Sequence, residues 1–107
     1  MSNTKILDVA SSAIGVEGDV VSADGGRAVI HIFATSYGGD GKIVLKASSD
    51  GVVFTTLEDA ATSSGLAEYS ADIIFNLDKL SQGWSFRADL VISSGTATGV
   101  QVYMGTN

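Results

Sequence analysis

The chain has 107 residues, no cysteine, one histidine and a formal net charge of −6. This length predicts a single domain, residues 1–107, which can bury a core without a disulfide or a metal to hold it together. Six scattered basic residues against twelve acidic ones argue against nucleic acid and against an anionic membrane surface as partners, because both bind clustered Lys and Arg. The N-terminus has no basic segment followed by a sustained apolar run, so we expect no signal peptide.

Strand signals dominate the chain, because short runs rich in Val, Ile, Phe and Thr alternate with clusters of Gly, Ser, Asp and Asn. Such spacing predicts an all-β fold, an antiparallel β-sandwich of about eight strands, and a jelly roll is one topology of this class. The segment Ser11–Val16 could extend either of the first two strands, Asp59–Gly65 predicts a long loop and Leu77–Leu80 predicts one helical turn. In chain order the expected strands are Thr4–Val9, Asp19–Ser22, Arg27–Thr35, Lys42–Ser48, Val52–Leu57, Glu68–Asn76, Trp84–Ile92 and Val100–Gly105.

Strict alternation of apolar and polar residues in three of these runs predicts sheets with one buried and one solvated face. In the last of the three, Trp84–Ile92, the apolar residues face inward while Arg87 and Asp89 face water. The Asp-Gly pair at residues 50 and 51, between two expected strands, predicts a turn of type I′ with a positive φ at Gly51. We expect the core to contain Leu45, Ile73, Phe75, Trp84, Phe86 and Leu90.

The run Arg27–Thr35 differs from the others because it is apolar on both faces. Its even-numbered residues predict a core face, and its odd-numbered residues Val29, His31 and Phe33 form a second apolar face. An apolar outer face needs a covering element or a partner subunit. The sequence therefore leaves two alternatives, a cover supplied by the N-terminal segment or a self-interface at Val29, His31 and Phe33.

Catalytic chemistry finds little support in the sequence, so we expect a protein that is not an enzyme and has no cofactor or metal site. His31 has no second histidine or cysteine to work with, and no Gly-x-Ser-x-Gly motif occurs. The Gly-rich segment Gly38–Lys42 lacks the spacing of a phosphate-binding loop and predicts a hairpin loop instead. Asp24, Asp40 and Asp50 do not have the register of a calcium-binding EF-hand loop.

Sugar binding is a second class to weigh, because exposed aromatic side chains can stack on sugar rings. Trp84 is the strongest candidate by residue type, but its inward register favours the core. Tyr37 and Tyr103 are isolated tyrosines and carry less weight.

Two stretches, Gly41–Leu57 and Gly83–Tyr103, resemble the small β-sandwich virion structural proteins of tailed bacteriophages. In the first, a strand ends in Ser-Asp-Gly, and an aromatic residue and Thr-Thr-Leu follow. In the second, an aromatic-x-Arg-Ala strand leads through a Ser/Thr/Gly turn into a Val-rich strand. The resemblance implies a capsid decoration, or cement, protein located in the virion and assembled in the host cytoplasm.

The same resemblance implies partners. These are copies of the chain itself, with a trimer as the favoured symmetry, and the major capsid protein. Two alternatives stay open at this point: a carbohydrate-binding module of similar fold, and a tail or connector component of the same kind of particle.

Overall fold

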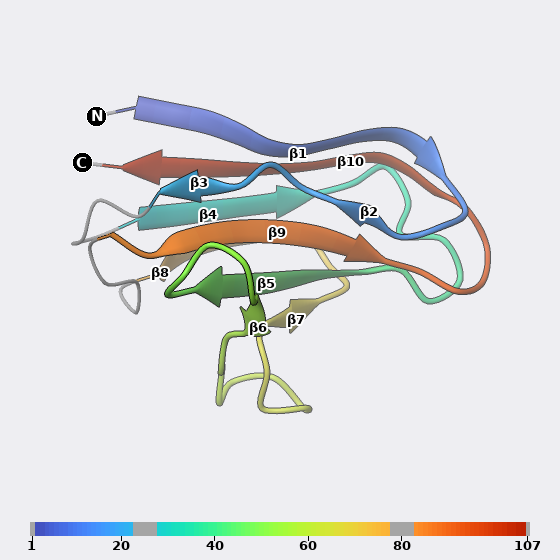
Figure 1. Ribbon diagram of the computed structural model, residues 1–107. Helices are drawn as coiled ribbons and strands as arrows, with labels where there is room; N and C mark the ends of the chain where they lie inside the picture. The colour runs from blue at the N-terminus through green and yellow to red at the C-terminus, as the bar shows by residue number, and fades with distance from the viewer. Residues whose placement is uncertain (1, 23–27, 78–82, 107) are drawn as a thin grey trace.

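The computed structural model describes residues 2–22, 28–77 and 83–106, which form two antiparallel β-sheets packed face to face (Figure 1). Sheet A contains, in spatial order, β1 (Ser2–Ser12), β10 (Ala97–Thr106), β4 (Ala28–Phe33) and β8 (Ile73–Leu77). The described residues contain no helix that could cross a membrane.

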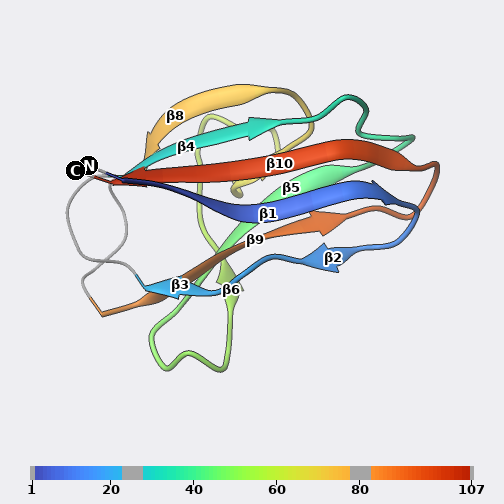
Figure 2. The same cartoon turned by 90° about the horizontal axis from the view of Figure 1, so that it is seen from above.

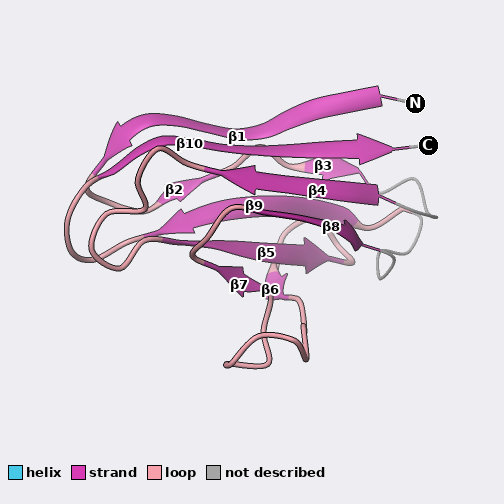
Figure 3. Ribbon diagram, turned by 180° about the vertical axis from the view of Figure 1, so that it is seen from behind, coloured by secondary structure: helices cyan, strands magenta, loops and turns pink. Residues whose placement is uncertain are grey.

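Sheet B lies on the other side of the core and has shorter outer strands. Its spatial order is β2 (Val16–Glu17), β9 (Ser85–Val91), β5 (Lys42–Ser48) and β6 (Thr55–Thr56). β3 (Val21–Ser22) also pairs with β9, and β7 (Glu68–Tyr69) also pairs with β5. Figure 3 shows the same chain from behind, with strands and connecting loops in different colours.

The topology is that of a jelly roll. β2 and β3 both pair with β9, and β6 and β7 both pair with β5, so each couple counts as one interrupted strand. The ten strands then reduce to eight, in two sheets with the orders first-eighth-third-sixth and second-seventh-fourth-fifth. This is the two-sheet arrangement of a jelly roll, and the predicted antiparallel β-sandwich is confirmed.

The core lies between the sheets and follows the predicted alternation. Leu45, Phe86 and Leu90 are buried as expected, and Phe75 on β8 is partly buried and packs against the core cluster to which they belong. The largest fully buried side chains are Phe86, Ile6, Ile30, Ile32, Ile43, Leu45, Leu90, Val100 and Val102.

The prediction of burial is wrong for two of the expected core residues, Trp84 and Ile73. Trp84 is 42% exposed, because β9 begins at Ser85 and Trp84 precedes the paired part of the strand. Ile73 is exposed because it begins β8, which is the edge strand of sheet A. In both cases the alternation is correct in parity but extends past the region where a second sheet can cover it.

The predicted single strand Glu68–Asn76 is also wrong, because the structure divides it between the sheets. β7 pairs with β5 in sheet B, and β8 pairs with β4 in sheet A. Residues 70–72 carry the chain from one sheet to the other. Both strands turn their apolar side chains toward the same core, which is why the period of two continues across the crossing.

The turn at Asp50-Gly51 has the predicted positive φ at Gly51, 77°, but it is not of type I′. Type I′ needs a positive φ at both central residues, and no described residue other than glycine has one. The Asp50 carboxylate instead accepts hydrogen bonds from the N–H groups of Val52 (2.8 Å) and Val53 (2.9 Å). Residues 49–54 therefore form a loop, and the expected strand Val52–Leu57 shrinks to β6.

Of the remaining predicted segments, some are confirmed and others fall outside the residues that the structure describes. β1 extends through Ser11 and Ser12, Val16 belongs to β2, and Asp59–Gly65 is a loop as predicted. The helical turn expected at Leu77–Leu80 falls mostly outside the described residues, as does Asp24.

Candidate functional site

The outer face of sheet A gathers the three residues predicted as a self-interface. On β4, Val29, His31 and Phe33 all point away from the core, whereas Ile30 and Ile32 are fully buried. The pairing register then sets side chains of three other strands beside them. We call this surface the open face, and its members are Lys5, Val29, His31, Phe33, Ile74 and Tyr103.

No described segment covers the open face. β1 pairs edge to edge with β10 and so extends sheet A instead of crossing it. Figure 2, the view from above, shows β10 and β4 with no described segment in front of them. Val29 is 39% exposed and Ile74 is 64% exposed. The alternative of a cover supplied by the N-terminal segment is therefore wrong for the part of that segment that the structure describes.

Aromatic contacts organise the open face. The rings of His31 and Phe33 lie with their centroids 4.6 Å apart, and the ring of Phe33 stacks on that of Tyr103 at 5.9 Å with an angle of 4° between the planes. The Lys5 ammonium lies 5.7 Å from the centroid of Tyr103, within cation–π range, and 3.3 Å from Asp8. The hydrogen bond to Asp8 raises the pKa of Lys5, so the cation is retained at the rim.

A hollow of about 370 Å³ opens in this face, and its cause is local. Gly105 lies between Asn3 and Val29 in one row across the sheet, and it contributes no side chain to the surface. The walls are formed by the neighbouring side chains, including His31, Phe33 and Tyr103. Such an apolar, aromatic hollow suits a protruding side chain of another protein surface.

His31, which the sequence analysis weighed as a catalytic base, lies at the centre of the open face. Within the described ranges, no hydrogen bond or ion pair joins His31 to a carboxylate or to a nucleophile. A base in a catalytic triad needs both partners within hydrogen-bond reach.

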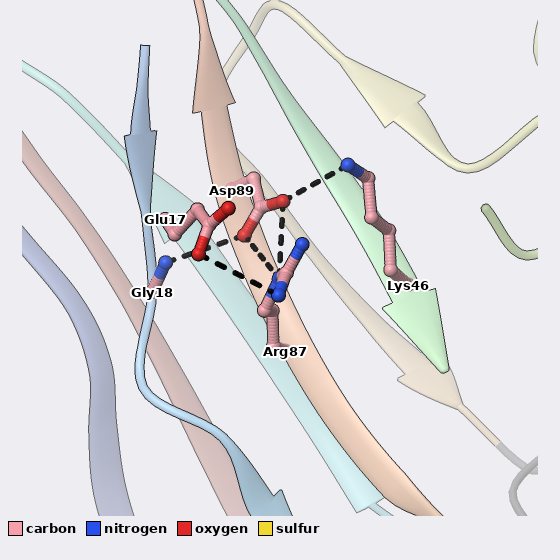
Figure 4. A network of polar contacts seen from close by, with 5 residues as sticks. All are labelled: Glu17, Gly18, Lys46, Arg87 and Asp89. Carbon is pink, nitrogen blue, oxygen red and sulfur yellow. Dashed lines mark hydrogen bonds and ion pairs between the residues drawn. The ribbon is translucent and has the colours of Figure 1, made fainter. Parts of the chain in front are cut away.

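The outer face of sheet B is built differently, around a buried carboxylate (Figure 4). Asp89 is only 4% exposed, which corrects the prediction that it faces water. Its oxygens accept from Arg87 Nε (2.9 and 3.2 Å), Lys46 Nζ (3.0 Å) and the Gly18 N–H (3.3 Å). Arg87 also lies 3.7 Å from Glu17. We call these groups the charged network, and the surface that holds it the closed face.

The loop after β5 completes the closed face. Figure 1 shows this loop curling across β9, and the ring of Phe54 lies 4.5 Å from the guanidinium of Arg87. Val44, which also points outward from sheet B, is buried. Every buried side-chain polar atom among the described residues has a hydrogen-bond partner. The buried polar groups of the closed face are therefore satisfied within one chain.

Comparison with known proteins supports the fold. No family model matches the chain, and no curated protein matches its sequence. Among solved structures, the crystal structure of the SPBc2 prophage-derived protein YomS is similar, with a TM-score of 0.64 and 15% sequence identity. The match covers 96% of this chain and 90% of that one. At this identity the similarity establishes a shared fold over almost the whole length of both chains.

Sequence reasoning found the centre of the open face and missed its surroundings. Val29, His31 and Phe33 lie together as predicted, while Lys5, Ile74 and Tyr103 were not assigned to the same surface. Tyr103 alternates with the buried Val102 and Met104, so its outward direction is visible in the sequence, but its position beside His31 depends on the pairing of β10 with β4.

The aspartates weighed as calcium ligands serve other purposes. Asp50 holds its own loop, and Asp40 accepts hydrogen bonds from the N–H groups of Ser93 (2.8 Å) and Ser94 (2.9 Å). Both carboxylates are thus occupied by N–H donors. In the described part of the chain, no three metal-ligating side chains of His, Cys, Asp or Glu come together.

Proposed function

We propose that the protein is a non-enzymatic structural component of a phage virion, a capsid decoration protein that associates with copies of itself through the open face. The observation that carries this proposal is the contrast between the two sheets. On one outer face the central charges pair within the chain, whereas the other presents aromatic rings and a hollow to the surroundings. An apolar surface of this kind marks an interaction site in a soluble protein.

Self-association explains why such a surface is tolerated. In a symmetric oligomer each copy buries its aromatic side chains against the next, and the favoured symmetry is a trimer. His31, at the centre of the row that also contains Tyr103 and Ile74, would lie at or near the contact. Several copies joined in this way would bind a capsid through many weak contacts that add by avidity, so each contact with the major capsid protein can be small.

The link to phage has two supports of different kinds. The jelly-roll fold is shared with a prophage-derived protein, and two stretches of the sequence resemble virion structural proteins of tailed phages. Neither support distinguishes a head from a tail, so a tail or connector component is the second candidate.

Immunogold electron microscopy of purified particles of the encoding phage tests the proposal. We expect gold over the heads, in many copies per particle. Gold confined to tails or to the connector would replace the proposal with the second candidate. Particles without any of this protein would contradict a virion role altogether.

A further inference from the structure

A second hollow, polar and separate from that of the open face, lies beside the start of β5. It has a volume of about 460 Å³ and shares no residue with the open face. One wall is the Gly-rich loop of residues 37–41, and the other is the tip of the loop at residues 62–64. Lys42, Glu68 and Ser70 line it between these walls. We call it the polar cleft.

The first wall is rigid. The Asp40 carboxylate accepts from the N–H groups and a hydroxyl of the turn at Ser93 and Ser94, and these bonds hold the pKa of Asp40 at about 2. Gly39 donates its N–H to the Ser94 carbonyl at 3.0 Å. A Cβ at Gly39 would approach that carbonyl oxygen to 2.8 Å, so the two turns can touch only because glycine is present.

Tyr37 is fixed in the same wall. Its hydroxyl donates to Asp72 at 2.8 Å, and the same carboxylate accepts the N–H of Ala34 at 3.1 Å. The ring packs partly against the core. Tyr37, a lining residue of the polar cleft, is therefore held at both its hydroxyl and its ring.

The second wall is stabilised by hydrogen bonds within its own loop. The N–H of Asp59 donates to Gly65 at 3.0 Å, and the hydroxyl of Thr62 donates to the Leu66 carbonyl at 2.6 Å. From β7, the Tyr69 hydroxyl donates to Asp59 at 2.5 Å. Both walls thus hold their shape before any ligand arrives, which lowers the entropic cost of binding.

The polar groups between the walls are available to a ligand. Lys42 and Glu68 form an ion pair at 3.3 Å, and both side chains stay partly exposed. Within the described residues, the hydroxyls of Ser63 and Ser70 make no hydrogen bond. The cleft therefore offers a cationic donor, an anionic acceptor and two hydroxyls that can act as either, with little net charge.

From this lining we infer that the polar cleft binds a neutral saccharide. Vicinal sugar hydroxyls both donate and accept, and they match an ammonium beside a carboxylate better than an apolar or an anionic ligand does. The volume is of the size that small ligands occupy. Phosphate fits poorly, because Asp40 lies in the Gly-rich loop, Glu68 lines the cleft and no helix follows that loop in the described chain.

An NMR titration tests the inference. Amide spectra of the full chain are recorded with lactose, maltose, cellobiose and N,N′-diacetylchitobiose, and with glucose 6-phosphate as the anionic comparison. We expect at least one neutral disaccharide to shift the amides of Gly38, Gly39, Ser63 and Ser70 in a saturable way at millimolar concentration. Glucose 6-phosphate should shift them less.

Two variants make the test specific. Ser70→Phe fills the cleft with a ring and should abolish the saturable shifts, whereas Ser11→Phe, on the exposed part of β1, should leave them unchanged. Both spectra report directly whether the fold is intact. The inference is overturned if no neutral disaccharide moves these amides, if Ser70→Phe binds as the parent does, or if glucose 6-phosphate binds more tightly. The titration is repeated with the Phe33→Asp variant, which alters the open face and not the polar cleft. The same saturable shifts in this variant would show that saccharide binding does not depend on self-association.

Discussion

The two outer faces of the sandwich solve the same problem in opposite ways. Each central strand pair carries side chains outward that cannot reach the core. On the closed face the central side chains are ions, Asp89 joins Lys46 and Arg87 into a network, and Phe54 from the loop at residues 49–54 lies over Arg87. On the open face the central side chains are rings: Phe33 stacks on Tyr103, His31 lies tilted against Phe33, and no described segment lies above them.

The contrast shows which polar groups are satisfied within one chain and which apolar groups are left at the surface. Ions that are paired and hydrogen-bonded within the chain need no partner, and opening them to a partner would cost desolvation. Apolar rings left at the surface gain free energy from any contact that removes them from water. We therefore expect changes on the closed face to affect folding, and changes on the open face to affect association.

The largest expected effect is that of Asp89→Ala on the closed face. The variant leaves Arg87 and Lys46 without their shared acceptor, so we expect the free energy of unfolding to fall by about 3 kcal/mol or more. Urea unfolding followed by fluorescence or circular dichroism measures it. The matched control is Asp8→Ala, which removes the exposed ion pair with Lys5 beside the open face and should cost less than about 1 kcal/mol. Equal losses of unfolding free energy in the two variants would contradict the proposed difference between the faces.

A smaller loss is expected from Gly51→Val, in the loop that covers the closed face. Gly51 has a φ of 77°, and a β-branched side chain is strained there, so the variant should lose about 1–2 kcal/mol. Ser49→Val, in the same loop but without a positive φ, serves as control. Thermal unfolding compares the two, and a Gly51→Val protein that melts with the parent would mean that this loop does not depend on its turn.

The smallest effect concerns acid, and it acts on the same loop through Asp50. Hydrogen bonds from Val53, Val52 and Ser48 lower the pKa of Asp50 from 3.8 to about 2. A depressed folded pKa contributes stability above pH 3.8, and this contribution is lost as the pH falls toward 2. Carboxyl carbon shifts in NMR should therefore titrate near 2 for Asp50 in the parent. A midpoint near 3.8 would show that the carboxylate does not hold the loop.

Local patterns predicted much of the fold because each strand needs only its own alternation. The bounds of β5 match the prediction, and the inward residues of β9 from Phe86 to Leu90 are buried as expected. Alternation fails where the sheet ends. Trp84 and Ile73 continue the correct parity, but no opposing strand covers them.

The candidate site was predicted in part for a similar reason. The double apolar character of β4 is a property of one strand, and it identified Val29, His31 and Phe33. The partners of these residues depend on which strands pair, and the burial of Asp89 depends on groups that β2 and β5 bring beside β9, the Gly18 N–H and the Lys46 ammonium. Such long-range pairings leave no trace in the spacing of residues along the chain.

Self-association through the open face can be tested by light scattering of the purified protein at tens of micromolar. We predict that the parent has a mass of three chains, that Phe33→Asp reduces it to the 10.9 kDa of one chain, and that the folded monomer keeps its circular dichroism spectrum. Val53→Asp, an equally polar change at an exposed loop position outside the open face, should keep the parent mass. A parent protein of 10.9 kDa, unchanged by Phe33→Asp, would contradict self-association through the open face.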